Sequence, residues 1–225
     1  MELDRLRKEL NPRQKALREA LQKPERHEDA IPLFLDQHGI LHSAKVAPEA
    51  PWSYEDLLLD KLTDTQYRII LDGQEHSLIW ILWHLSRIED ITMNLLVSEK
   101  DQLFTRENWQ AKMKAPIKHT GNGTGLETAN ALDAAVNIDA LREYRHAVGR
   151  ATRRIVKQLT PADFTRKPTP ENLQRIKNEG AVLDVGYGVI DYWGKQTVAG
   201  LLLMPPTRHT IIHLNEARRI INKLS

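Results

Sequence analysis

Apolar positions recur at helical spacing along most of this chain, and they are densest in one long segment. Between about Thr65 and Val97 the sequence predicts a single helix, and its middle, residues 76–85, is apolar nearly all round. A helix without a polar face belongs deep inside a domain. Further helices are predicted over residues 11–21, 28–43, 138–158, 189–204 and 207–224, with a short one over 53–61.

Prolines and polar loops separate these helices. Pro24 interrupts the chain after the first helix, and the pair Pro205-Pro206 predicts a break before the last one. The alternation of Val182, Asp184 and Gly186 is compatible with a brief strand but is too short to define one.

Long helical segments without a convincing sheet predict an all-α fold. The arrangement we expect is a four-helix bundle with an accessory N-terminal helix and short connecting helices. A chain of 225 residues can bury a substantial core within one domain. We therefore interpret residues 1–225 as a single domain, in which residues 1–24 add the accessory helix.

The composition limits the chemistry and the partners. The absence of cysteine excludes disulfides, thiolate metal ligands and a cysteine nucleophile. The 32 basic and 30 acidic residues nearly cancel, to a net charge of +2, and basic residues are not interleaved with aromatic ones, so nucleic-acid binding is not expected. No apolar stretch approaches the ~20 residues of a membrane span, and no targeting segment is recognised. We expect a cytoplasmic protein without a membrane partner.

Two histidines stand one turn apart on the last predicted helix, at the edge of its apolar arc. The i, i+4 spacing of His209 and His213 is the one by which a helix offers two nitrogens to one metal ion. Such a pair also arises by chance in a chain with nine histidines. His84 lies on an apolar face of the long central helix, where an unpartnered ring costs ~1–3 kcal/mol. It either bonds Ser77 or a backbone carbonyl, or is a third ligand.

A rival pair has the same spacing nearer the N-terminus. His38 and His42 lie near the centre of an apolar face, although Gly39 between them weakens the helix. On periodicity alone this pair is as good a candidate as the C-terminal one. The other histidines have no second histidine at this spacing and are interpreted as surface or loop residues: His27, His76, His119 and His146.

The two segments that hold His84 and the C-terminal pair resemble a known family. Trp80–Asp90 and Met204–Glu216 are similar to the DinB-like family, also described as the DinB and YfiT-type metal-dependent hydrolase superfamily. Its members are four-helix bundles in which one histidine of the second helix and an HxxxH pair of the last bind nickel or zinc. The resemblance therefore implies a divalent-metal site made of His84, His209 and His213.

The same resemblance assigns a lesser role to the rival pair. It implies that His38 and His42 line a pocket instead of binding the metal. The resemblance begins at about His38, so the helix before Pro24 and the long segment 162–188 depart from a minimal bundle. These departures are candidates for shaping a pocket or a homodimer contact.

A site with three neutral imidazoles leaves coordination positions open, as catalytic metal sites do. Imidazole suits zinc, nickel, copper or iron, so the metal is not specified. Glu216 is a candidate hydrogen-bond partner of a ligand imidazole or a candidate base, although a solvated carboxylate is an equally good interpretation. Arg87 is a candidate for steering an anionic substrate into the pocket, but Glu89 and Asp90 beside it favour a surface ion pair.

These observations lead to competing hypotheses about function. The first is a metal-dependent enzyme that acts on a small molecule, either as a hydrolase through an activated water or as a transferase through a thiol cosubstrate. The transferase version follows from the resemblance, since some DinB-like proteins use low-molecular-weight thiols. The second is a non-catalytic ligand-binding or stress-response protein with an adventitious or absent metal, and the third is a structural homodimer.

Overall fold

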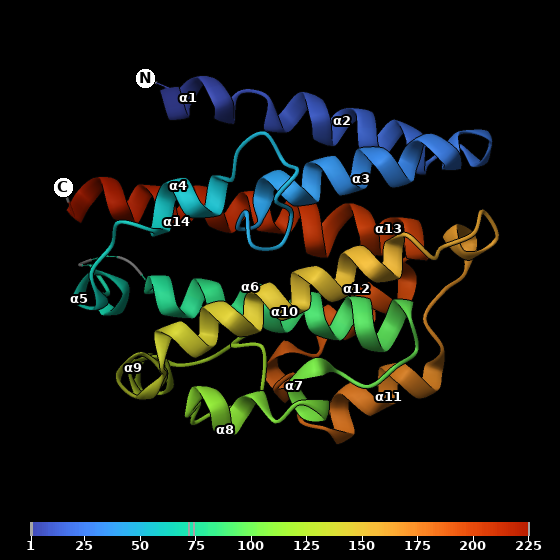
Figure 1. Cartoon of the computed structure of the whole chain (residues 1–225). Helices are drawn as coiled ribbons and strands as arrows, with labels where there is room; N and C mark the ends of the chain where they lie inside the picture. The colour runs from blue at the N-terminus through green and yellow to red at the C-terminus, as the bar shows by residue number, and fades with distance from the viewer. Residues whose placement is uncertain (1, 72, 74, 225) are drawn as a thin grey trace.

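Four long helices pack around one another in the computed structural model, which describes residues 2–71, 73 and 75–224. They are α3 (His27–Leu41), α6 (Leu78–Asp90), α10 (Ile138–Val156) and α14 (Thr210–Leu224). Helix α6 contacts both α10 and α14, and α3 contacts α10 (Figure 1). No strand occurs in the described ranges, so the predicted all-α four-helix bundle is confirmed.

Shorter elements connect and cover these helices. The remaining α-helices are α1 (Glu2–Arg7), α2 (Leu10–Leu21), α4 (Tyr54–Leu59), α5 (Asp64–Arg68), α7 (Leu103–Arg106), α8 (Trp109–Met113), α9 (Leu126–Ala135), α11 (Pro170–Asn178), α12 (Gly188–Lys195) and α13 (Val198–Leu203). Tight 3-10 turns are η1 (Pro24–Arg26), η3 (Asp163–Thr165) and η4 (Asp184–Gly186). Wider π-helical segments are η2 (Ile91–Val97) and η5 (Met204–His209).

The central helix is shorter than the sequence pattern predicts. Helix α5 ends at Arg68, and the described residues between it and Ser77 are not helical; residues 72 and 74 lie outside the description. Helix α6 begins after Ser77, whose side chain accepts a hydrogen bond from the backbone N–H of Trp80. This N-cap satisfies a backbone donor that has no partner within the helix. Every residue of α6 is buried, as its pattern predicts.

The C-terminal region is helical where a break is predicted. Helices α13 and α14 are joined without interruption through η5, which contains Pro205-Pro206. Prolines cannot donate to carbonyls of the preceding turn, and the Thr207 hydroxyl bonds the Leu202 and Leu203 carbonyl oxygens there at 3.0 and 2.8 Å. The chain breaks earlier, between α12 and α13, where Thr197 caps α13. The possible strand over residues 182–186 forms η4 in its second half.

The N-terminal helices cover one side of the bundle. Helix α2 lies along α3 and also contacts α13 (Figure 1). Its inward-facing Leu17 and Ala20 are fully buried in the same apolar cluster as Phe34. Gln14 donates to the Leu203 carbonyl at 2.9 Å, which ties α2 to the last turn of α13.

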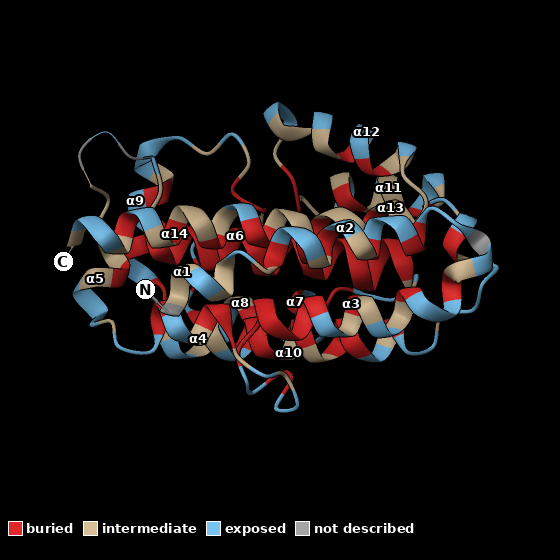
Figure 2. Cartoon of the chain, turned by 90° about the horizontal axis from the view of Figure 1, so that it is seen from above, coloured by how far each residue is buried: buried red, intermediate tan, exposed pale blue. Residues whose placement is uncertain are grey.

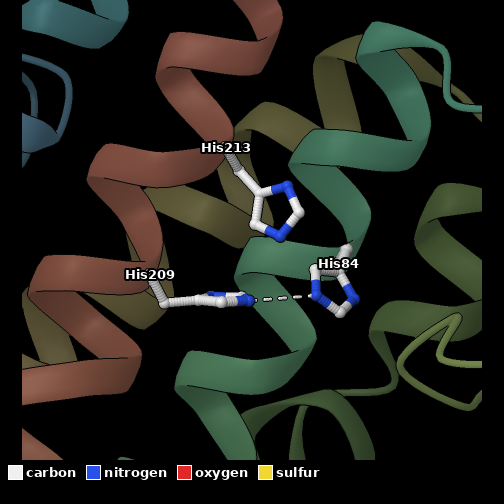
Figure 3. A group of neighbouring side chains, drawn as sticks. All are labelled: His84, His209 and His213. Carbon is white, nitrogen blue, oxygen red and sulfur yellow. Dashed lines mark hydrogen bonds between the residues drawn. The ribbon is translucent and has the colours of Figure 1, made fainter. Parts of the chain in front are cut away.

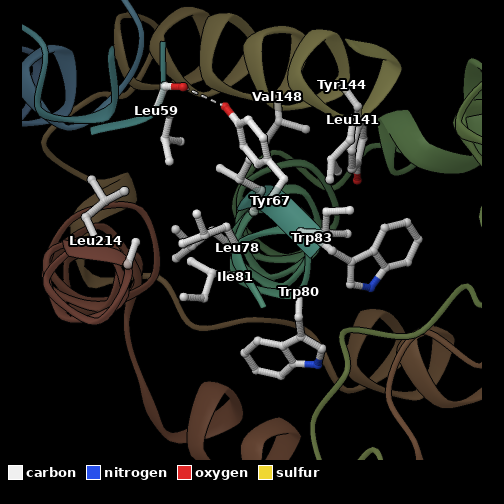
Figure 4. Close-up of a cluster of buried hydrophobic side chains, with 14 of the residues drawn as sticks. Leu59, Tyr67, Leu78, Trp80, Ile81, Trp83, Leu141, Tyr144, Val148 and Leu214 are labelled. Carbon is white, nitrogen blue, oxygen red and sulfur yellow. Dashed lines mark hydrogen bonds between the residues drawn. The ribbon is translucent and has the colours of Figure 1, made fainter. Parts of the chain in front are cut away.

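Burial is concentrated on the inner faces of the long helices (Figure 2). Around α6 the aromatic rings of Tyr67, Trp83 and Tyr144 pack with Leu78 and Leu214 into one apolar cluster (Figure 4). This packing fixes α6 between α10 and α14, and α6 carries residues of both histidine clusters described below. Among the described helices, none combines the length and the apolar character that crossing a membrane requires.

Candidate metal centre

His84, His209 and His213 converge between α6 and the C-terminal helix. His84 comes from the middle of α6, His209 ends η5, and His213 lies in the first turn of α14. Each offers a ring nitrogen within 4.8 Å of the others, and the His84 and His209 Nε2 atoms are 3.2 Å apart. The three rings point toward one another (Figure 3). The structure thus brings together the three histidines that the sequence singled out.

Hydrogen bonds to the outer nitrogens orient two of these rings. His84 Nδ1 lies 2.8 Å from the Thr120 carbonyl oxygen, and His213 Nδ1 lies 2.7 Å from Glu216 Oε2. Both partners accept, so each Nδ1 carries the proton and donates. The Nε2 lone pairs of His84 and His213 are therefore directed into the cluster, as in metal sites where the second ring nitrogen is anchored by a carbonyl or a carboxylate.

The chemistry of this donor set fits a divalent metal ion. Burial lowers the pKa of His84 to about 3 and lowers the pKa of His209 well below its ordinary value, so both rings are neutral near pH 7. Bonds of about 2.0–2.1 Å at tetrahedral angles separate two ligand nitrogens by about 3.3 Å, close to the 3.2 Å seen for His84 and His209. Within the described chain, His209 Nδ1 is buried without a hydrogen-bond partner.

Glu216 is a shared acceptor at the edge of the cluster. Its two oxygens lie 2.7 Å from His213 Nδ1 and 2.7 Å from His76 Nδ1. Although burial raises the pKa of Glu216, the hydrogen bonds from His213 and His76 outweigh it and lower that pKa to about 2. The carboxylate is therefore ionised and fixes the His213 ring. The candidate role as hydrogen-bond partner of a ligand imidazole matches this geometry.

His76 is the residue of this region that the sequence interpretation missed. It was interpreted as a surface or loop residue and does lie in the loop before α6, yet its ring stacks on Trp80 at 3.5 Å between centroids, and Trp80 stacks on His84 at 4.6 Å. Spacings of four residues, from His76 to Trp80 to His84, are the signal that could have placed the three on one face. The ring stack links the candidate metal centre to a cavity of about 360 Å³ lined by Glu75, His76, Trp80, Thr124, Leu126 and Ala129.

The rival pair forms a separate, closed cluster with Glu89 of α6. The Nε2 atoms of His38 and His42 each lie 2.9 Å from one oxygen of Glu89, and all three side chains are fully buried. His42 Nδ1 also lies 3.0 Å from the His38 carbonyl oxygen. Both partners of His42 are oxygen acceptors, so its ring nitrogens face acceptors and not an open coordination position. These rings face Glu89 and not the three-histidine cluster.

Positive groups around Glu89 complete that cluster. Although burial raises the pKa of Glu89, the neighbouring imidazoles of His42 and His38 and their hydrogen bonds hold it well below its ordinary value. Thr152 donates to the same carboxylate at 2.7 Å, and the Arg145 guanidinium lies 3.8 Å from it. The set of His38, His42 and Glu89 has enough ligand atoms for a metal, but its nitrogens carry hydrogen bonds where a metal needs lone pairs.

Arg87 lies in the core and not on the surface. Its guanidinium donates to the Lys118 carbonyl, the Tyr144 hydroxyl and Gln102 Oε1 at 2.8–3.1 Å. It also forms a buried ion pair with Asp90 at 3.5 Å. These contacts brace α6 against α10 and the loop before Thr120, so the surface ion pair expected from the sequence is wrong.

Two further histidines are neither surface nor loop residues. His146 is fully buried on α10, and His27 is 4% exposed. The His27 ring stacks on Phe164 at 4.3 Å between centroids. Both are held by the packing of distant segments, which the spacing of residues along a single helix does not report.

Comparison with known proteins supports one family. A sequence profile described as the DinB superfamily matches residues 49–217, a range that includes His84, His209 and His213. No match was found among curated proteins.

Proposed function

The chain belongs to the DinB superfamily, and from that premise and the histidine cluster we propose that it is a metal-dependent enzyme acting on a small molecule. The observation that carries the proposal is the convergence of His84, His209 and His213, with two Nε2 lone pairs directed inward by Thr120 and Glu216. Three imidazole nitrogens leave at least one coordination position for a nucleophile or a substrate.

The residues of the site would have distinct roles. His84, His209 and His213 would hold zinc or nickel, and Glu216 would keep the His213 ring in its Nδ1–H form. The bound metal would supply Lewis acidity and lower the pKa of a water or thiol nucleophile. The cavity beside Trp80, at about 360 Å³, is in the size range of small-molecule sites. We favour hydrolysis or transfer of a low-molecular-weight thiol.

Elemental analysis of untagged protein tests the metal first. The proposal expects close to one zinc or nickel per chain, and loss of that metal in a His84→Ala variant that remains folded by circular dichroism. Protein that contains no metal and takes up none would contradict it, and would favour a ligand-binding protein.

A reaction screen then tests catalysis. Metal-loaded protein is mixed with activated esters alone, and with electrophiles together with glutathione, bacillithiol or mycothiol. Consumption of an ester supports the hydrolase version, and consumption of one thiol supports the transferase version. If no combination reacts faster with wild-type protein than with the His84→Ala variant, the enzymatic proposal is wrong.

A further inference from the structure

His76 lies beside the candidate metal centre but is not one of its ligands. Its Nδ1 is 2.7 Å from Glu216 Oε1, and its ring lies flat on Trp80 at an interplanar angle of 6°. The hydrogen bond and the stack hold the imidazole in one orientation. Because Glu216 also accepts from His213 at 2.7 Å, a single carboxylate connects His76 to a candidate ligand.

The same hydrogen bond decides which nitrogen of His76 is basic. The partner of His76 Nδ1 is a carboxylate oxygen at 2.7 Å, which accepts, so His76 Nδ1 donates. In the neutral ring Nε2 then holds the lone pair. Within the described part of the chain Nε2 of His76 has no hydrogen-bond partner, and the His76 side chain is 24% exposed. The basic nitrogen is therefore not used by the fold.

The surroundings of His76 provide room for a reactant. His76 and Trp80 line the cavity of about 360 Å³, together with Thr124 and Leu126. Trp80 also stacks on His84, so the cavity and the candidate metal centre share Trp80 as a neighbour. A molecule in the cavity would lie against an imidazole whose opposite nitrogen is anchored by a carboxylate, which is the arrangement of a general base oriented by a third group.

We propose that His76 is a catalytic residue, the general base that accepts a proton from the nucleophile through Nε2. This inference rests on the proposed function. The nucleophile is a water or a thiol: its O–H or S–H bond breaks, the proton passes to Nε2, and the electron pair forms the new bond to the electrophilic carbon. The leaving group departs with the electron pair of the broken bond and takes the proton back from His76. Glu216 compensates the imidazolium charge in between.

The kinetic test uses full-length, zinc-loaded protein and para-nitrophenyl acetate as the probe. A general base contributes about 10²–10⁴-fold, so His76→Gln is expected to lower kcat by about 10²-fold or more, with KM and zinc content little changed. Glu19→Gln is the control, because it removes an exposed charge on α2 from a residue that does not line this cavity. Unchanged kcat in the His76→Gln variant would overturn the inference.

Chemical rescue separates proton transfer from a structural role. A His76→Ala variant leaves space for a free imidazole beside the cavity, and added methylimidazole is expected to restore part of its kcat without changing its zinc content. A structural role predicts no restoration. If His76→Ala fails to fold, the His76→Gln variant and its kcat still decide the question.

A spectroscopic readout keeps this inference separate from the proposed function. Zinc-loaded wild-type protein that does not hydrolyse the probe counts against the hydrolase version only. The His76 inference is then judged by ¹⁵N NMR of the imidazoles in the full chain. In the neutral ring we expect the proton of His76 on Nδ1 and a bare Nε2. An Nε2-protonated neutral ring would overturn it, because that nitrogen could not accept a proton.

Discussion

Two histidine clusters lie in the same bundle, and each joins an i, i+4 pair to one residue of α6. In the first, His209 and His213 meet His84; in the second, His38 and His42 meet Glu89. The helix spacing is identical, yet the hydrogen atoms are arranged in opposite ways. A histidine as the third member leaves lone pairs facing inward, whereas a carboxylate draws the N–H groups toward itself. The third residue, and not the HxxxH spacing, decides which cluster is suited to a metal ion.

The clusters also differ in their access to solvent. His38, His42 and Glu89 are fully buried, while His213 is 15% exposed and Glu216 is 19% exposed. A resident metal and a substrate both need an entry path, and the ring stack of Trp80 on His84 places the three-histidine cluster next to a cavity. The closed cluster resembles a structural clamp between α3, α6 and α10.

The largest expected difference between the clusters is in metal content. His209→Ala and His213→Ala each remove one of three nitrogen donors and should abolish stoichiometric binding of zinc or nickel. His38→Gln and His42→Gln are the matched controls and should retain the metal, if they fold. Elemental analysis after dialysis measures both sets. Loss of metal in the control pair with retention in the first pair would reverse the assignment of the two clusters.

Removing the shared carboxylate of the closed cluster should affect stability and not metal content. Glu89→Ala leaves the positive groups around it without their partner, and breaking a buried ion pair costs about 3–5 kcal/mol. Urea unfolding followed by circular dichroism gives the free energy of unfolding. Thr152→Val removes only one donor to the same carboxylate and should cost about 1 kcal/mol. Equal losses in both variants would show that Glu89 does not organise this cluster.

The corresponding carboxylate of the open cluster should affect metal affinity. Glu216→Gln weakens the anchor of His213 Nδ1, and loss of such an outer partner typically lowers metal affinity 10–100-fold, or about 1.4–2.8 kcal/mol. Competition with a chromophoric chelator measures the affinity, and the Glu75→Gln variant is the control. An unchanged affinity would mean that the His213 ring is held by packing alone.

Acid should destabilise the metal-free protein through both clusters. Burial lowers the pKa of His84 and of His38 from 6.5 to about 3. The unfolded chain therefore binds more protons between these values, so stability is complete above about pH 6.5 and declines as pH falls toward 3. Each histidine contributes at most about 1.4 kcal/mol per pH unit. Urea titrations at several pH values should show a shallower decline for His84→Asn than for wild type, and a decline of equal slope would contradict the buried neutral ring.

Much of the fold and of the candidate site could be predicted from the sequence. The all-round apolar pattern of residues 78–85 places α6 correctly in the core, and the turn spacing of His209 and His213 places both on one face. The set of His84 with this pair came from the family resemblance, because periodicity alone did not separate it from His38 and His42. That choice depends on Glu89, whose position opposite the rival pair is a tertiary contact.

Other features depended on contacts that the sequence does not display. The helix predicted from residue 65 is interrupted, because Ser77 caps a new helix. His76 lies in this interruption, so its contact with Trp80 was not predicted. The break predicted at Pro205-Pro206 is absent because the helix continues as a π segment, and the Thr207 hydroxyl bonds the Leu202 carbonyl that lacks the N–H of Pro206. Thr120 contributes only its backbone carbonyl oxygen to His84. Every residue type has this oxygen, so the sequence could not identify the contact.

The π-helical segment η5 has a consequence for the histidine pair that follows it. A π turn holds one more residue than an α turn, so everything downstream is offset by about 100° from where the same residues wound as a regular α-helix would place it. His209 closes this segment and His213 follows it; their azimuth toward α6 is therefore set by the extra residue near Pro205-Pro206. Winding the same residues as a regular α-helix would swing both imidazoles away from His84, whereas deleting one residue within the π turn would restore a regular ladder and leave their azimuth nearly unchanged. The irregular turn therefore sets the direction in which the histidines of the last helix face.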